Sequence, residues 1–288
     1  MTDAFLVHRG LLFTVAYEML GSVADAEDVL QDSWLRWSDV DVSTVRDPRA
    51  YLVRLVTRQA LNRMRTVKRR REAYVGPWLP EPLATTQDVA DDVELADSVS
   101  FAMLVVLETL TPLERAVFVL RDVFGFGYDE IATATERSTD AVRQVASRAR
   151  KHVQARRPRV AVTSDGAEVS QRFLEAAVTG DLRALLAVLA PDVVLTADGG
   201  GVISAALRPI VGVDKVARFL SGVRPSEVEL GTEWVHVNGR RAVRLSIGGV
   251  LDSIVSVEVR DGLVREIFFV RNPDKLGHLD EAVGLTRT

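Results

Sequence analysis

The sequence contains no cysteine, only four histidines and no apolar run long enough to cross a membrane. The absence of cysteine excludes disulfides, iron–sulfur clusters, thiolate zinc sites and cysteine nucleophiles. The histidines, at positions 8, 152, 236 and 278, are too scattered for the i, i+4 pair of a helical metal site. The longest apolar runs, 101–107 and 184–190, fall far short of the roughly 20 residues that span a membrane. Because the N-terminus also lacks the pattern of a signal peptide, we expect a soluble cytoplasmic protein that binds no metal and no membrane.

Charge is sorted along the chain. The 288 residues are 47% apolar, which excludes an intrinsically disordered chain and suits two or three packed domains. The net charge of −4, taken as a sum, argues against binding to nucleic acid. However, residues 48–71 hold nine basic and no acidic side chains, residues 72–114 nine acidic and no basic, and residues 115–159 ten basic and five acidic. One basic run is usually a solvated helix face. Two runs separated by an acidic one predict two phosphate-binding modules joined by a segment that avoids phosphate.

The first module is predicted to contain three helices. Apolar residues at helical spacing indicate helices over 5–20 and 23–37, and an aspartate–proline pair at 47–48 indicates the start of a third that runs to about residue 70. Four polar residues share one face of that third helix, opposite an apolar stripe: Arg54, Arg58, Asn62 and Arg65. Such a helix suits a membrane surface or DNA, and arginine with asparagine favours DNA. We expect Trp34 and Trp37, one turn apart, to pack in the core.

The pattern of the second module is typical of a helix-turn-helix. A capping box at 111–114 starts one helix, and a glycine-containing turn leads to a short helix over 128–135 and a long one over 140–154. Four side chains of the long helix are predicted to point outward: Arg143, Gln144, Ser147 and Arg148. A plain helical hairpin has the same apolar pattern. It does not require the seven positive charges between 143 and 159, which favour a recognition helix in the major groove.

Both modules resemble those of the extracytoplasmic function (ECF) bacterial sigma factors. Residues 1–75 resemble the promoter-melting domain of that family, and residues 96–159 resemble its −35 domain, notably over 110–115 and 140–150. The resemblance implies that helix 23–37 binds the β and β′ subunits of the RNA polymerase core, through Asp25, Glu27, Asp28, Gln31 and Asp32. It further implies two contacts with promoter DNA. The −10 element would meet Arg54, Arg58, Asn62 and Arg65, and the −35 element Arg143, Gln144, Ser147 and Arg148.

The linker over 76–95 narrows this resemblance. Residues 78–82 are similar to a motif of the SigJ-like ECF group, whose members carry a fused C-terminal SnoaL-like domain: Trp78, Leu79, Pro80, Glu81 and Pro82. Two motifs of that group also have counterparts near the C-terminus. The first is Asp198, Gly199, Gly200 and Gly201, and the second is Asn272, Pro273, Asp274, Lys275 and Leu276. The resemblance implies interdomain regulatory contacts for all three motifs.

The chain departs from the family pattern at three positions. Val202 stands where the glycine-rich motif usually continues with lysine, which puts any role of that cation in doubt. Glu136 stands at a turn position often held by glycine, and a left-handed backbone there costs an ordinary residue about 1 kcal/mol or more. Arg58 stands where many members have asparagine, which could alter the −10 preference.

Residues 165–288 have the element order of an α+β domain. Helices are predicted over 169–178, 182–189 and 213–221, and strands over 193–196, 232–237, 241–247, 253–259 and 264–270. The SnoaL-like (cystatin-like) resemblance implies a cone-shaped sheet wrapped by helices that can hold a small ligand. Asp198 and His236 are the candidates for a general base in that cone. A turn aspartate and a lone strand histidine are more often structural, so we expect no catalytic residue.

The sequence thus predicts a multi-domain protein, in which two all-α sigma-factor domains precede an α+β SnoaL-like domain over 165–288. We expect a non-enzymatic sigma factor without a cofactor, which directs RNA polymerase core to promoters and is modulated by its own C-terminal domain. Two alternatives stay open. A stand-alone helix-turn-helix regulator would footprint duplex DNA tightly without polymerase. A SnoaL-like isomerase or cyclase with a DNA-targeting appendage would turn over a small molecule, and substitution of Asp198 and His236 would abolish that turnover.

Overall fold

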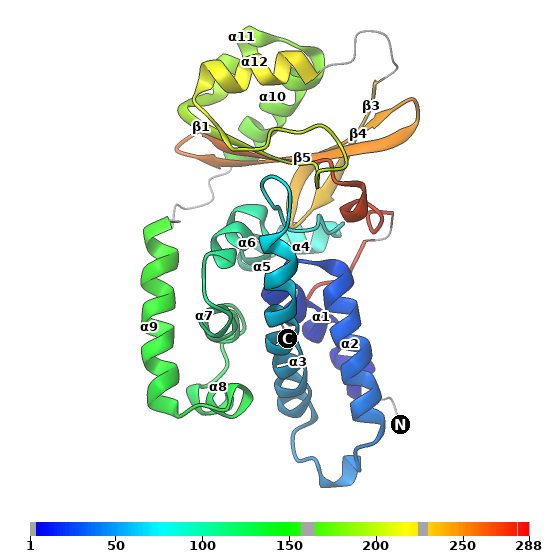
Figure 1. The fold of residues 1–288 in the computed structure, drawn as a ribbon, viewed down its shortest axis with the longest axis vertical. Helices are drawn as coiled ribbons and strands as arrows, with labels where there is room; N and C mark the ends of the chain where they lie inside the picture. Colours follow the sequence, from blue (N-terminus) through cyan, green and yellow to red (C-terminus); the bar gives the residue numbers. More distant parts are fainter. Residues whose placement is uncertain (1–3, 157–164, 224–229, 281, 288) are drawn as a thin grey trace.

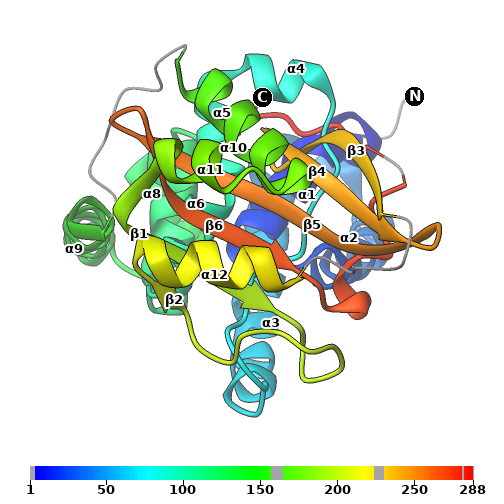
Figure 2. The same cartoon turned by 90° about the horizontal axis from the view of Figure 1, so that it is seen from above.

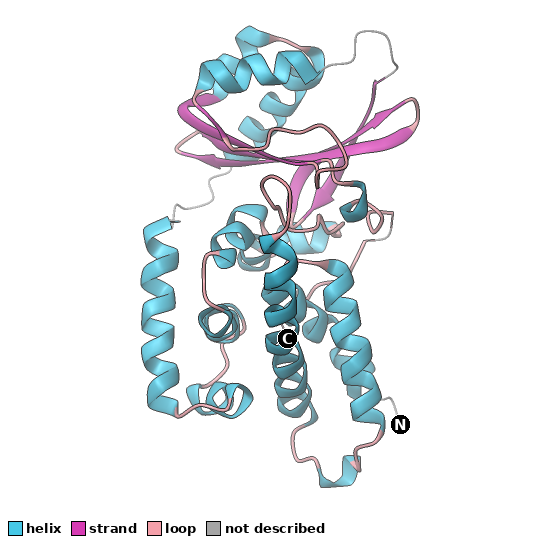
Figure 3. Cartoon of the chain, viewed as in Figure 1, coloured by secondary structure: helices cyan, strands magenta, loops and turns pink. Residues whose placement is uncertain are grey.

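The computed structural model describes residues 4–156, 165–223, 230–280 and 282–287. A helical part and an α+β part are stacked along the longest axis, and the described strands all lie in the α+β part (Figure 1, Figure 3). The helical part comprises α1 (Ala4–Leu20), α2 (Val23–Ser38), η1 (Val42–Thr44), α3 (Pro48–Glu72), α4 (Gln87–Asp91), α5 (Val93–Val99), α6 (Phe101–Glu108), α7 (Pro112–Phe118), η2 (Val119–Val123), α8 (Tyr128–Thr135) and α9 (Thr139–Arg156).

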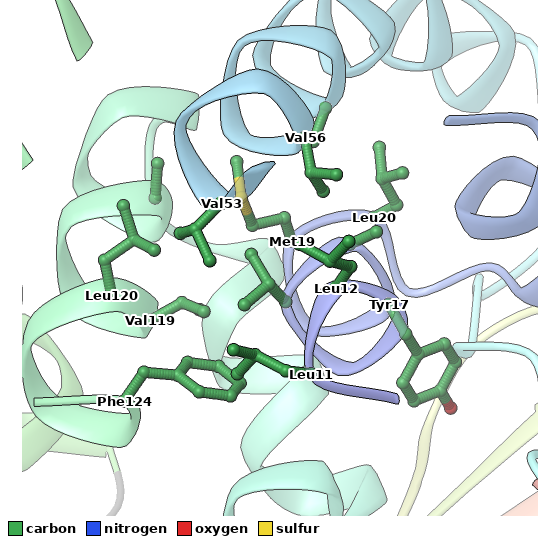
Figure 4. Packing of buried hydrophobic residues seen from close by; sticks show 14 of the residues in the cluster. Leu11, Leu12, Tyr17, Met19, Leu20, Val53, Val56, Val119, Leu120 and Phe124 are labelled. Carbon is green, nitrogen blue, oxygen red and sulfur yellow. The ribbon is translucent and has the colours of Figure 1, made fainter. Parts of the chain in front are cut away.

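The two helical modules share one hydrophobic core. Helix α1 lies against α2 and α3, and α3 also lies against α7 and α8 of the second module. Met19 of α1, Val53 of α3 and Leu120 of η2 point into the same buried cluster (Figure 4). Because burying apolar surface drives such packing, this shared core fixes the two modules against each other.

Most helical predictions are confirmed, with local corrections. The capping box at Thr111 and Glu114 is present, and of the two possibilities for the turn at Glu136 the structure has the left-handed backbone (φ 55°). Trp37 is buried, as expected, whereas the expectation is wrong for Trp34, which is 37% exposed and packs edge-on to Phe5. No described helix is long and apolar enough to span a membrane.

The α+β part is a six-stranded curved sheet in the order β2-β1-β6-β5-β4-β3. Its elements are α10 (Asp165–Thr179), α11 (Leu182–Val188), β1 (Leu189–Asp198), β2 (Ile210–Val211), α12 (Val213–Val223), β3 (Leu230–Val237), β4 (Arg240–Ile247), β5 (Val250–Arg260), β6 (Leu263–Val270) and η3 (Pro273–Lys275). Strands β1 and β6 are parallel and the other pairs antiparallel. The expected hairpin turns are confirmed, with positive φ at residues 238–239 and 261–262. The α+β fold class is therefore confirmed.

The sheet is covered on both faces. Helices α10, α11 and α12 lie across one face (Figure 2), where Phe173 and Ile267 belong to the apolar cluster. The opposite face packs on the linker and α6, since Leu79 and Phe101 share a second cluster with Phe268, whose ring lies 5.6 Å from that of Phe101. The C-terminal domain is therefore packed directly on the helical modules.

Candidate functional site: the linker junction and the two basic helices

The linker meets the C-terminal domain at a buried carboxylate, Asp198, which ends β1 and has no exposed surface. Its side chain accepts hydrogen bonds from Lys275 Nζ (2.7 Å), from the backbone N–H of Leu79 (2.8 Å) and from Tyr74 Oη. The N–H of Gly200 donates a fourth bond (3.1 Å). Three segments distant in sequence thus converge on one carboxylate.

Lys275 carries the matching charge and is 5% exposed. Besides Asp198, its ammonium donates to the Leu79 carbonyl (2.5 Å) and lies over the rings of Trp78 (4.2 Å) and Tyr74 (4.9 Å). Burial lowers the pKa of Lys275 to about 8, although Asp198 opposes the shift. Burial and the bond to Asp198 raise the pKa of Tyr74. A buried ion pair of this kind is costly to break, because either partner alone is left as an uncompensated charge.

The glycine-rich loop lets the backbone come this close. A Cβ at Gly199 would lie 2.2 Å from the carbonyl O of Ile203, and one at Gly201 (φ 74°) would lie 2.9 Å from Cβ of Val75. Beside the loop, Asn272 Nδ2 donates to Tyr74 Oη (2.8 Å). Val202 is 66% exposed, so the position that lacks the family's lysine lies on the surface. Gly201 therefore allows the close approach of Val75, while Gly199 allows the loop to fold tightly on itself.

The same linker also holds the first helical module. Glu81 accepts hydrogen bonds from the N–H groups of Val23 (2.5 Å) and Ala24 (3.2 Å) and from Ser22 Oγ (2.9 Å), so it caps α2. Its carbonyl accepts from Tyr17 Oη of α1 (2.7 Å). The Glu81 carboxylate therefore connects the linker to the N-terminus of α2, the helix that is predicted to bind polymerase.

A turn of the sheet completes the junction. Asn238, between β3 and β4, donates to Tyr17 Oη (2.6 Å) and to the Val99 carbonyl (2.8 Å), and it accepts from the N–H of Leu83 (3.0 Å). Sequence reasoning identified Asn238 only as a turn residue and did not single out Tyr17 or Tyr74. Their partners lie 64 or more residues away in the sequence, so no local pattern could indicate them.

A buried charge cluster joins the two helical modules. Arg71 of α3 and Arg115 of α7 both pair with Glu108 of α6, and Arg71 stacks 3.7 Å over Trp78. Arg115 also donates to the carbonyl of Glu18 in α1 (2.8 Å). Burial raises the pKa of the Glu18 carboxyl to about 8. The end of α3 is thereby fixed to α6, α7 and the linker.

The residues predicted to contact the −10 element lie in different surroundings. Asn62 and Arg65 are exposed and bond each other (3.1 Å), while Arg54 lies over the Tyr51 ring (4.9 Å). Arg58 instead reaches the helix-turn-helix, where it donates to the Thr133 carbonyl (3.0 Å) and pairs with Glu136 (3.3 Å). Arg58 is therefore engaged with α8 in this arrangement.

The residues predicted to contact the −35 element form one exposed surface on α9: Arg143, Gln144, Ser147 and Arg148. Arg143 pairs with Asp140 (2.9 Å) and is 57% exposed. Buried α9 side chains on the opposite side, including Val142 and Val145, face the helical core. The helix thus presents the polar surface that the sequence predicts, while its binding to DNA stays a prediction.

The residues predicted to contact polymerase on α2 differ in availability. Asp25 is 6% exposed and pairs with Arg63 of α3 (2.7 Å), as does Asp28 (2.5 Å). Gln31 and Asp32 are exposed, and Glu27 pairs with Arg9 at the surface. Glu27, Asp28, Gln31 and Trp34 line a shallow hollow between α1 and α2.

The two candidate bases, Asp198 and His236, both lie at contacts with the linker. Asp198 is fully engaged by its four donors, and the backbone carbonyl of His236 accepts from Thr85 of the linker (3.0 Å). Within the described residues, no cluster of acidic or histidine side chains could hold a metal ion.

Comparison with known proteins gives a consistent result. The model of Sigma-70 region 2 matches residues 5–71, and that of Sigma-70, region 4 matches residues 100–153. The chain is 40% identical to the ECF RNA polymerase sigma factor SigJ of Mycobacterium tuberculosis over 282 residues, which cover 93% of this chain and 90% of that protein. It is 31% identical to the probable ECF sigma factor SigI of the same organism, over 99% of this chain and 97% of SigI. The crystal structure of M. tuberculosis SigJ is similar as well, with a TM-score of 0.76 and 35% identity over 96% of this chain and 98% of SigJ.

Proposed function

Because this chain belongs to the ECF RNA polymerase sigma factors, which act in transcription initiation, we propose that its C-terminal domain controls when its two DNA-binding modules become available. The single observation that carries this proposal is the linker junction, in which residues 74–83 bond both the C-terminal domain and the first helical module. A linker bound in this way cannot extend along polymerase until these bonds break.

The proposed partners are the RNA polymerase core and promoter DNA. The hollow between α1 and α2 offers polymerase the side chains of Glu27, Asp28 and Gln31 beside Trp34, with Asp32 nearby on the same helix. We assign Asp25 mainly to holding α2 on α3, since Arg63 neutralises it. The proposed domains are residues 1–75 for polymerase binding and −10 recognition, 76–95 for the linker, 96–159 for −35 recognition and 165–288 for regulation.

The state of Arg58 supports a closed, inactive arrangement. A side chain that bonds the Thr133 carbonyl and Glu136 cannot at the same time bond the −10 element. The proposed −35 surface on α9 is exposed, so the closed arrangement restricts α3 more than α9. Opening would separate α3 from α8 and free Arg58 to join Arg54, Asn62 and Arg65 on DNA.

The C-terminal domain is proposed as a regulator without catalytic function. The three predicted interdomain motifs meet around Asp198. Its carboxylate, which could otherwise act as a base, accepts the hydrogen bonds that join these motifs. Both faces of the sheet are covered, one by its own helices and one by the linker and α6. These features suit a domain that binds the linker.

Run-off transcription with purified core polymerase tests the proposal. Asp198→Asn weakens the junction and is expected to raise promoter-specific output at equal concentrations of folded protein. Asp192→Asn, on the same strand but with a side chain 72% exposed, is the matched control and should leave output unchanged. Unchanged or reduced output from Asp198→Asn would overturn the regulatory role. Tight footprinting of duplex DNA without core polymerase would favour a stand-alone regulator instead.

A further inference from the structure

The C-terminal tail, residues 282–287, returns from the α+β domain onto the helical modules. Its Val283 N–H donates to the carbonyl of Ala84 (2.9 Å), and Val283 forms a parallel bridge with Thr85. On its other side, Ala84 pairs antiparallel with Val237 at the end of β3. The linker residues 84–85 thus lie between the edge of the sheet and the tail, as an added strand would.

One apolar side chain anchors the tail in the helical core. Leu285 is 8% exposed and belongs to the same buried cluster as the α1 side chains. Together with Val89, Leu95 and Phe124 it lines a hollow on the helical part. The next residue, Thr286, donates its N–H to the fully buried Thr14 Oγ1 of α1 (3.2 Å). The tail is therefore seated in a groove between α1, the linker helices and η2.

A charged side chain fixes the end of the tail. Arg287 donates twice to Asp92 (3.0 and 3.1 Å) and pairs with Glu94. These acidic residues belong to the stretch 72–114, which has no basic side chain of its own. Asp92 also accepts from the N–H of Leu95 and so caps α5. Arg287 thus brings a positive charge to two carboxylates of this stretch, Asp92 and Glu94.

We propose that residues 282–287 form a strap that keeps the closed arrangement shut, and that its release is a required step in opening. The proposal rests on the proposed function, since opening matters only if the closed form is inactive. The strap connects all parts: the sheet edge through the linker, α1 through Thr286, and α5 through Arg287. It holds by one buried apolar side chain and a few hydrogen bonds, so it can detach locally while the sheet stays folded.

A reversible disulfide tests the strap in the full chain, which has no other cysteine. A Cβ placed on Gly10 of α1 would lie 3.1 Å from Cγ2 of Thr286. This is close to the roughly 3 Å that a disulfide allows between the Cβ of one cysteine and the sulfur of the other. The double variant Gly10→Cys/Thr286→Cys should therefore oxidise with the strap in place. The two single variants and the unsubstituted chain control for the substitutions and for the reductant.

We expect the oxidised double variant to give at least tenfold less run-off transcript than the same protein after reduction. A second variant, Leu285→Ser/Arg287→Glu, should speed hydrogen exchange at the Val283 amide, which donates to the Ala84 carbonyl, at least tenfold, while Arg265→Glu, at a surface ion pair away from the tail, should not. Equal transcription from oxidised and reduced protein, or unchanged exchange at Val283, overturns the strap. Neither result bears on control by the junction, which Asp198→Asn tests separately with the tail intact.

Discussion

Substitution of Asp198 by asparagine should release the linker locally. The side chain keeps its shape but loses the charge that balances Lys275, whose side chain is 6% exposed and bonds no second carboxylate among the described residues. In addition, one oxygen that accepted hydrogen bonds becomes an NH2 group, which cannot accept a bond from the donors that surround it. Removing one partner of a buried ion pair costs about 3–5 kcal/mol. The free energy that holds the linker on the C-terminal domain should fall by about this amount.

Hydrogen exchange at the Leu79 amide measures this loss directly, because that N–H donates to Asp198. A loss of 3 kcal/mol or more corresponds to roughly 100-fold faster exchange, since every 1.4 kcal/mol is tenfold. Lys275→Met alone should also speed exchange. The double variant Asp198→Asn/Lys275→Met should lose less of the free energy that holds the linker than the two single variants lose together. The difference, the coupling energy, should be about 1–3 kcal/mol.

Asp192→Asn controls for a change of charge on the same strand. Two results would refute the reasoning. One is exchange at Leu79 that stays within twofold of the unsubstituted chain in Asp198→Asn. The other is strict additivity in the double variant, which would mean that the two charges do not depend on each other.

Three further changes follow from other contacts. Glu81→Gln removes the charge that caps α2 and should lower stability by about 1–2 kcal/mol in thermal denaturation; an unchanged Tm would contradict the cap. Burial raises the pKa of Glu18 to about 8 from its usual 4.5, so the folded state binds the extra proton, and stability should decline by up to about 1.4 kcal/mol per pH unit between these values. Urea denaturation from pH 5 to 8 should show this decline in the unsubstituted chain and not in Glu18→Gln. Arg58→Asn removes bonds to α8 and should increase the radius of gyration in X-ray scattering, whereas Arg54→Asn, whose side chain lies over Tyr51 within its own helix, should not.

Local signals in the sequence predicted local structure well. The threonine–proline start of α7 and the two hairpin turns each depend on a few neighbouring residues, and all are present. The start of β1 was harder to predict, because Leu189 continues the apolar pattern of the preceding helix, whereas in the structure it pairs with Val264 of β6. A tertiary contact thus overrides local propensity at this residue.

The candidate site was predictable only in part. The three motifs around Trp78, Asp198 and Lys275 were identified by resemblance, and the structure adds that they bond one another. Tyr17 and Asn238 complete the junction from 221 residues apart, and neither has a local signature. Long-range contacts of this kind depend on how the modules pack, which periodicity does not encode.

The distance between α3 and α9 tests the central claim most directly. Dyes attached at Thr66→Cys and Gln154→Cys, both exposed positions in a chain without cysteine, report that distance by energy transfer. We expect a single closed distance in the free protein, a longer one on binding core polymerase, and a partly open population in Asp198→Asn without polymerase. An unchanged distance on polymerase binding, in a complex that transcribes, would mean that the protein does not open to work.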